Sequence, residues 1–256
     1  MKISIIQNKI KWGFKQDNLD SFGNLVQSYY GKTDLVVLPE MFSTGFAVNS
    51  PELSETIDGE TFNCVKKWAN EGNFAVVGSI MAKQGEVYFN RSFFCKPDGQ
   101  IFYADKRHLF VGDEKRYFSG GDKILNIEYK DLKFRVLVCY DLRFPVWSRY
   151  TKQNPYDVLI YCANWPKDRI DAWDTLLTAR AMENQAYVCA SNAVGIDGYK
   201  VHHNGHSCLI EPRGKRILEF EENGTGIKTA EIDADYQKKI RTKFPFLEDA
   251  DGFDLR

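Results

Sequence analysis

The strongest constraint on the fold is an alternation of two kinds of segment along the whole chain. Short apolar runs rich in β-branched residues, which are typical of buried strands, occupy residues 34–38, 74–78, 91–95, 134–139, 157–161, 187–190 and 206–210. Longer segments with apolar residues at helical spacing occupy residues 18–30, 61–71 and 171–185. Strands that alternate with helices favour parallel strands covered by helices, so we expect an α/β fold.

Some connections are too short to contain a helix. Residues 84–86 and 96–99 are glycine-containing turns between strand-like runs, which is typical of β-hairpins. The sheet is therefore predicted to be mixed. Because no linker stands out, we predict a single domain over residues 1–256. Its tail, residues 235–256, is too apolar to be free in solvent, and we expect it to pack on the domain or on a dimer partner.

Charge and hydropathy exclude several classes of partner. The formal net charge is −1, and the basic residues are scattered. The chain thus lacks the basic patch that binds nucleic acid or an anionic membrane. No apolar run is long enough to span a bilayer, and the N-terminal segment does not have the pattern of a signal peptide. We expect a cytoplasmic protein with no nucleic-acid or membrane partner.

The cysteines and histidines do not form a metal-binding pattern. None of the six cysteines belongs to a C-x-x-C pair, and most lie inside apolar runs, as reduced core thiols do. The three histidines of residues 202–206 are too close together for known zinc spacing, and we interpret them as loop-to-strand residues. There is also no P-loop and no dinucleotide fingerprint. We predict no metal and no other cofactor.

Three strand-like runs end in a reactive side chain: Glu40, Lys106 and Cys139. Open α/β sheets bind ligands beyond the carboxyl ends of their strands, so these side chains could converge. A thiol is mostly protonated at neutral pH, and Glu40 could take its proton as it attacks a carbonyl. Lys106 and the backbone N–H of Tyr140 could stabilise the resulting oxyanion. Taken singly, each residue also fits a structural role, and spacing alone does not decide between the two.

The segments 38–42, 105–110 and 138–145 resemble the three signature segments of the nitrilase superfamily of carbon–nitrogen hydrolases. Residues 178–185 and 205–214 fit the same resemblance, which covers essentially the whole chain. The resemblance implies a four-layer α-β-β-α sandwich with mixed sheets, which usually forms a homodimer through its helices.

The same resemblance implies specific residue roles. It assigns a catalytic triad to Glu40, Lys106 and Cys139. Glu114 matches a second glutamate that orients the lysine and the substrate amide in family members. The alternative for Glu114 is a loop carboxylate within a charged run.

Two further segments, 162–166 and 241–253, look like the bacterial ω-amidases. Those enzymes hydrolyse the terminal amide of 2-oxo-dicarboxylic monoamides. The likeness implies that Trp165 lines the substrate pocket; a place in the core behind the sheet is its alternative. Arg143 could attract a substrate carboxylate, but we expect it to pair with a nearby carboxylate and shape the cysteine loop.

Together these features predict a cofactor-independent amidase with a small-molecule amide as its substrate. Catalysis is assigned to Glu40, Lys106, Cys139 and Glu114, and substrate binding to Tyr140 and Trp165. The expected substrates are 2-oxoglutaramate and 2-oxosuccinamate, which would yield the oxo-acid and ammonia through a thioester. One alternative is the same mechanism acting on N-carbamoyl amino acids or deaminated peptides. Another is a dimeric binding module without catalytic activity.

Overall fold

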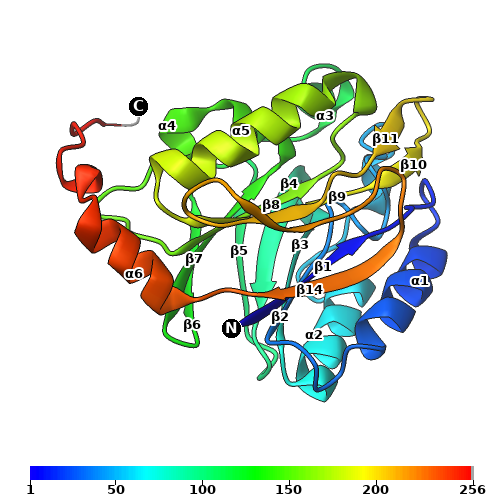
Figure 1. Ribbon diagram of the computed structural model, residues 1–256. Helices are drawn as coiled ribbons and strands as arrows, with labels where there is room; N and C mark the ends of the chain where they lie inside the picture. Colours follow the sequence, from blue (N-terminus) through cyan, green and yellow to red (C-terminus); the bar gives the residue numbers. More distant parts are fainter. Residues whose placement is uncertain (255–256) are drawn as a thin grey trace.

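Two six-stranded sheets pack face to face at the centre of the molecule (Figure 1). The computed structural model describes residues 1–254. In order across the first sheet, the strands are β14 (Gly226–Glu231), β1 (Lys2–Gln7), β2 (Leu35–Val37), β3 (Ala75–Gln84), β4 (Val87–Cys95) and β5 (Ile101–Asp105). Those of the second sheet are β13 (Arg216–Glu219), β12 (Cys208–Ile210), β9 (Tyr187–Asn192), β8 (Val158–Ala163), β7 (Leu132–Val138) and β6 (Leu125–Tyr129). A separate hairpin pairs β10 (Val194–Ile196) with β11 (His202–Asn204).

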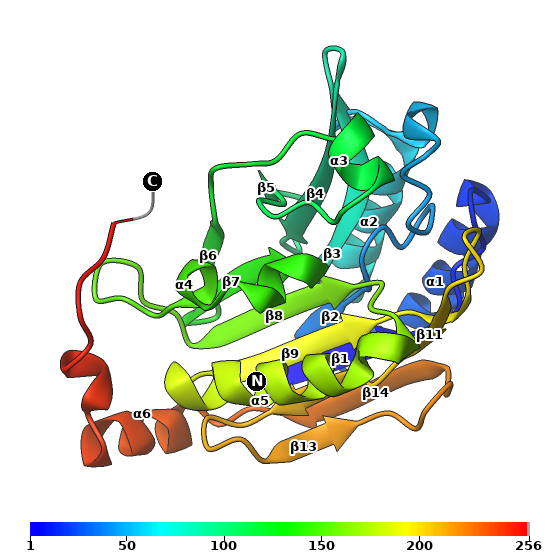
Figure 2. The same cartoon turned by 90° about the horizontal axis from the view of Figure 1, so that it is seen from above.

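Helices cover the outer faces of both sheets. The α-helices are α1 (Lys15–Gln27), α2 (Glu60–Gly72), α3 (Asp113–Tyr117), α4 (Pro145–Ser148), α5 (Ile170–Glu183) and α6 (Ala234–Lys243). Helices α1 and α2 pack on the first sheet and α5 on the second, on opposite sides of the molecule (Figure 2). The layers therefore run α-β-β-α, and the predicted four-layer sandwich is confirmed.

Each sheet has a parallel centre and antiparallel edges. Strands β1, β2 and β3 are parallel, as are β7, β8 and β9, whereas β14, β4 and β5 pair antiparallel with their neighbours. The hairpin connections β3–β4 and β4–β5 lie at the two turns that the sequence predicts. The prediction of mixed sheets is therefore correct.

Side-chain alternation along the central strands explains why both faces of each sheet are buried. In β8, Val158 and Ile160 point into the layer between the sheets. Leu159 and Tyr161 point to the other side, where they pack with Trp173 of α5. Because both faces are covered, the strand reads as one continuous apolar run rather than as an alternating pattern.

The C-terminal segment lies against one end of the second sheet (Figure 1). The Arg241 guanidinium on α6 donates to the Asp157 carboxylate over 2.9 Å and to the Tyr156 carbonyl over 2.7 Å. Leu247, which follows α6, is buried. Within residues 1–254, no helix has both the length and the apolar character needed to cross a membrane.

Candidate active site

The two sheets bring the three predicted reactive residues together at one end of the sandwich. Glu40 follows β2 and Lys106 follows β5, both in the first sheet, whereas Cys139 follows β7 in the second. The Lys106 ammonium lies 3.0 Å from Glu40 Oε1. It also lies 3.0 Å from Glu114 Oε2, and all three side chains are fully buried. Glu114, which the family resemblance predicts to orient the lysine, is thus in direct contact with it.

A tight turn presents the Cys139 thiol. Cys139 has a φ of 45°, in the left-handed region that a residue with a Cβ rarely adopts, and it begins the 3-10 helix Cys139–Arg143. Asp141 stabilises the turn by accepting a hydrogen bond from the Val138 N–H over 3.1 Å. The N–H of Tyr140 lies in the first turn of this helix, where backbone donors have no intrahelical acceptor.

Glu40 is held in place by donors on three sides. Its Oε1 accepts from Lys106 over 3.0 Å and from the Asn90 side-chain amide over 2.7 Å. Its Oε2 accepts from the Asn164 N–H over 2.8 Å. The Asn164 side chain also donates to the Glu40 carbonyl over 2.7 Å. The carboxylate is therefore fixed in one orientation close to the thiol, whose pKa it raises.

The second carboxylate is bound almost as tightly. Glu114, on α3, accepts from Lys106, from Asn90 over 2.9 Å and from the Phe110 N–H over 2.5 Å. Burial raises the pKa of Glu114, and the Lys106 charge only partly opposes this effect. The loop that contains Phe110 is thereby tied to the buried ion cluster.

The resting site contains a neutral thiol beside a charged amine. Burial raises the pKa of Cys139 well above its ordinary value, Glu40 raises it further, and Lys106 opposes the shift. Burial alone would lower the pKa of Lys106, but the charges of Glu114 and Glu40 outweigh that effect and raise it. A thiol in this environment must lose its proton during attack rather than before it.

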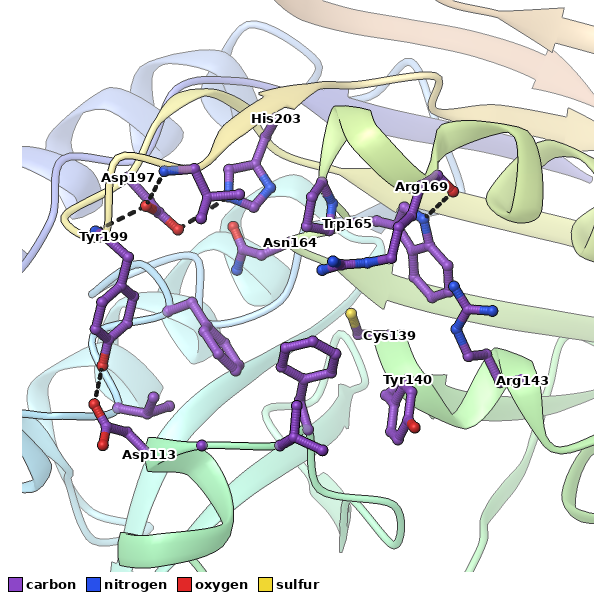
Figure 3. A pocket seen from close by; sticks show the side chains of 17 residues that line it. Asp113, Cys139, Tyr140, Arg143, Asn164, Trp165, Arg169, Asp197, Tyr199 and His203 are labelled. Atoms are coloured by element: carbon purple, nitrogen blue, oxygen red, sulfur yellow. Dashed lines mark hydrogen bonds and ion pairs between the residues drawn. The ribbon is translucent and has the colours of Figure 1, made fainter.

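Cys139 lies at the base of a cavity of about 330 Å³, within the range of small-molecule sites (Figure 3). Tyr140 and Trp165, both predicted to bind substrate, line it. Trp165 also packs 5.5 Å from Trp173 in the core of the second sheet, and its indole N–H donates to the Arg169 carbonyl over 2.7 Å. Trp165 therefore lies both in the cavity wall and against the core of the second sheet.

The interpretation of Arg143 is wrong. Its guanidinium lies 4.9 Å from the centre of the Trp165 ring, in the wall of the cavity, and it forms no ion pair with any carboxylate of residues 1–254. The nearest acid in the cysteine turn, Asp141, is already bound by the Val138 N–H and by the His108 ring over 2.7 Å. Arg143 consequently remains available to a ligand.

A second arginine of the cavity was missed by the sequence analysis. Arg169 ends the 3-10 helix Lys167–Arg169, and its guanidinium lies 5.2 Å from the centre of the Phe110 ring. It also has no ion-pair partner among the described residues. Arg169 follows Trp165 by four residues, and this proximity in sequence was the one indication of its place. Nothing else in the sequence distinguishes it from a surface arginine.

The hairpin β10–β11 supplies the opposite wall of the cavity (Figure 3). Asp197 pairs with the His203 ring over 3.1 Å, and the Tyr199 hydroxyl donates to Asp113 over 2.6 Å. His203 thus lies in the cavity wall, a place that its sequence context did not indicate. Within residues 1–254, no group of three or more histidine, cysteine or acidic side chains could hold a metal ion.

Comparisons with known proteins agree with this geometry. The sequence model of the carbon-nitrogen hydrolase family matches residues 2–242. Omega-amidase YafV of Escherichia coli strain K12 is 38% identical over 256 residues, which cover 100% of this chain and 98% of that protein. The 2-oxoglutaramate amidase of Bacillus subtilis strain 168 is 34% identical over 251 residues, or 96% of each chain.

A solved structure leads to the same classification. The crystal structure of XC1258 from Xanthomonas campestris, a CN-hydrolase superfamily protein with an arsenic adduct in its active site, superposes with a TM-score of 0.97. It is 36% identical, and the match covers 100% of this chain and 99% of that one. The resemblance inferred from the sequence is confirmed. The chain therefore belongs to the carbon–nitrogen hydrolase family.

Proposed function

We propose that this protein is an ω-amidase that hydrolyses the terminal amide of a 2-oxo-dicarboxylic monoamide, such as 2-oxoglutaramate or 2-oxosuccinamate. The observation that carries the proposal is the pair of cavity arginines, Arg143 and Arg169, without carboxylate partners in residues 1–254. Two guanidinium groups beside the thiol favour a substrate with an amide at one end and a carboxylate at the other. The names of the relatives in Escherichia coli and Bacillus subtilis support the same substrate class.

The proposed reaction begins with the thiol. Cys139 attacks the amide carbon while Glu40 takes the thiol proton, which forms a tetrahedral intermediate. The oxyanion is stabilised by the Lys106 ammonium and the Tyr140 N–H. Collapse of the intermediate breaks the carbon–nitrogen bond, and Glu40 returns the proton to the departing ammonia. A thioester on Cys139 remains.

Hydrolysis of the thioester completes the cycle. Glu40 takes a proton from water as the water attacks the thioester carbon, and the proton then returns to the Cys139 sulfur as the acid leaves. Glu114 holds the Lys106 ammonium in position throughout. Because burial excludes bulk water from this ion cluster, each charge acts on the reacting atoms with little screening.

Ammonia release tests the proposal. The protein should release ammonia from 2-oxoglutaramate and 2-oxosuccinamate much faster than from butyramide, which has no carboxylate. N-carbamoyl amino acids and deaminated peptides should be poor substrates. The assignment is wrong if a carbamoyl compound is turned over and the oxo-acid amides are not. A lack of turnover and of any acyl adduct on Cys139 across the panel would favour the binding-module alternative.

We also propose that the chain forms a cytoplasmic homodimer from a single domain over residues 1–256. In support, Val146 of α4, Met182 of α5 and Phe244 at the end of α6 expose large apolar side chains. Gln185, which follows α5, donates to the Phe244 carbonyl over 2.8 Å, so the ends of α5 and α6 are neighbours. Light scattering coupled to size-exclusion chromatography should give twice the chain mass, and a monomer mass at micromolar concentration would contradict the proposal.

A further inference from the structure

One side chain in the middle of a strand connects both buried glutamates. Asn90 lies on β4, is fully buried, and was not singled out by the sequence. Its side-chain nitrogen donates to Glu40 Oε1 over 2.7 Å and to Glu114 Oε1 over 2.9 Å. Its backbone carbonyl accepts from the Lys106 backbone N–H over 2.8 Å. The Asn90 side chain therefore joins the two carboxylates, and its backbone pairs with that of Lys106.

The charges of this cluster do not balance. Two carboxylates face a single ammonium with no exposure to solvent, which leaves one negative charge in excess. The thiols of Cys139 and Cys162 lie near the carboxylates, and Asp141 adds negative charge near Lys106. Arg143 and Arg169 line the cavity, and Lys115 and Arg116 flank Glu114 on α3, but within residues 1–254 only Lys106 forms an ion pair with either glutamate. Such a site favours uptake of a proton by one carboxylate, and a protonated Glu40 could not act as the base.

The orientation of the Asn90 amide opposes this uptake. Both hydrogens of its nitrogen point at carboxylate oxygens, and hydrogen bonds of this kind favour the ionised form. Its side-chain oxygen has no hydrogen-bond partner among the described residues. The reverse orientation would place that oxygen against two carboxylates. The amide thus leaves its own acceptor unused and directs both donors to Glu40 and Glu114.

We propose that Asn90 is a positioning residue that keeps Glu40 and Glu114 ionised and aligned on Lys106. Its role is to extend the activity of the general base to lower pH. The proposal depends on the assignment of Glu40 as the base but not on the identity of the amide substrate. It can therefore be tested by a reaction of the thiol that needs no substrate turnover.

The test compares the pH dependence of two reactions in the wild-type protein and Asn90→Ala. One is ammonia release from 2-oxoglutaramate, and the other is alkylation of Cys139 by iodoacetamide, followed by intact-mass spectrometry. Loss of the two donors should shift the acid limb of both profiles upward by about one pH unit. At neutral pH, kcat/KM should fall roughly 10- to 100-fold, as expected for lost hydrogen bonds to charged groups. If the amide is not a substrate, the alkylation profile alone still tests the role of Asn90.

A matched control separates positioning from stability. Asn184 is also fully buried, and its side chain donates to the Arg180 carbonyl over 2.9 Å and accepts from the Tyr150 N–H over 2.8 Å. Asn184→Ala should lower the melting temperature without moving either acid limb. An unshifted limb in Asn90→Ala, or an equal shift in Asn184→Ala, would overturn the proposal.

A second variant keeps the proposal testable if Asn90→Ala does not fold. Asn90→Asp keeps the size of the side chain but replaces the donating nitrogen with an acceptor. Three carboxylates would then surround one ammonium, so the alkylation limb should move upward at least as far as in Asn90→Ala. The proposal would also be overturned if a folded Asn90→Asp protein had the acid limb of its alkylation profile at the same pH as the wild-type protein.

Discussion

Cys139 combines two features that are costly in an ordinary core residue: a left-handed backbone conformation and a buried thiol close to a carboxylate. Cys139→Ala should retain the fold and lose turnover by on the order of 10⁴-fold or more, because the covalent step has no other nucleophile. Cys139→Ser should be nearly as inactive, since a lone carboxylate deprotonates a hydroxyl far less readily than a thiol. Ammonia release and circular dichroism measure the two properties. Substantial activity of either variant would contradict the assignment of the nucleophile.

Arg169 gives a separable prediction about substrate binding. Arg169→Met keeps much of the aliphatic volume over the Phe110 ring but removes the charge. If the guanidinium binds the substrate carboxylate, KM for 2-oxoglutaramate should rise roughly 10- to 100-fold, as for a lost charge-assisted hydrogen bond. The slow hydrolysis of butyramide should change little. Steady-state kinetics on both amides checks this. An equal loss on the two amides would assign Arg169 to shaping the cavity instead.

The residues that could be predicted from sequence share a local signature, and the others do not. Glu40, Lys106 and Cys139 each end an apolar run within a recognisable segment. Asn90 lies inside a strand, and Arg169 lies in a polar turn, so neither has a local context that marks it. Their contacts depend on which segments the two sheets bring together, and a pattern along the chain contains no such information.

At the scale of elements, the central strands could be predicted because both of their faces are buried. The edge strands β14, β13 and β6 could not. Strand β14 pairs with β1 over six residues, yet its side chains are exposed or half-buried, so it has no apolar run. The strand expected over residues 206–210 begins only at Cys208, because His206 has a φ of 61°. Backbone pairing, rather than side-chain burial, defines these edges.

The alternation of strands and helices left the number of sheets open. Alternation is compatible with one large sheet or with two, because the apolar run of a strand indicates only that the strand is buried. The prediction of two sheets came from the family resemblance. The packing of apolar strand faces against each other, as of Val158 and Ile160 against the first sheet, is a long-range property of the folded chain.

The hairpin β10–β11 gives a prediction at this scale. Tyr199 donates to Asp113, the residue before Glu114, and so joins the hairpin to the first residue of α3 on the other side of the cavity (Figure 3). Tyr199→Phe removes this connection while it retains the ring that packs on Trp12. Because the hydrogen bond is partly exposed, the expected effect is a roughly 2- to 10-fold rise in KM with little change in melting temperature. Unchanged kinetics would show that the two walls are held together by packing alone.

At the scale of the whole molecule, the candidate active site depends on how the two sheets meet. Glu40 and Lys106 come from the first sheet and Cys139 from the second, so no single sheet contains a complete site. The sheets meet through aromatic contacts such as Phe94 with Phe134, whose ring centres are 5.6 Å apart. Both side chains are fully buried. Packing between the sheets therefore sets the separation of Glu40, the proposed base, from the Cys139 thiol.

Phe134→Ala tests this dependence. Truncation of a buried phenylalanine costs about 3–5 kcal/mol in the free energy of unfolding, which for a chain of this length lowers the melting temperature by roughly 6–20 °C. If the interface between the sheets also sets the distance from thiol to carboxylate, kcat should fall by about 10-fold or more at temperatures where the protein is fully folded. The reason is that a displacement of reacting groups by about 1 Å is enough to slow a reaction strongly.

The matched control is Phe62→Ala on α2. Phe62 is equally buried, and its ring centre lies 5.6 Å from that of Phe93 in an outer layer. It should lose similar stability and keep most of its kcat. Equal losses of kcat in the two variants would mean that the site responds to stability in general rather than to the contact between the sheets.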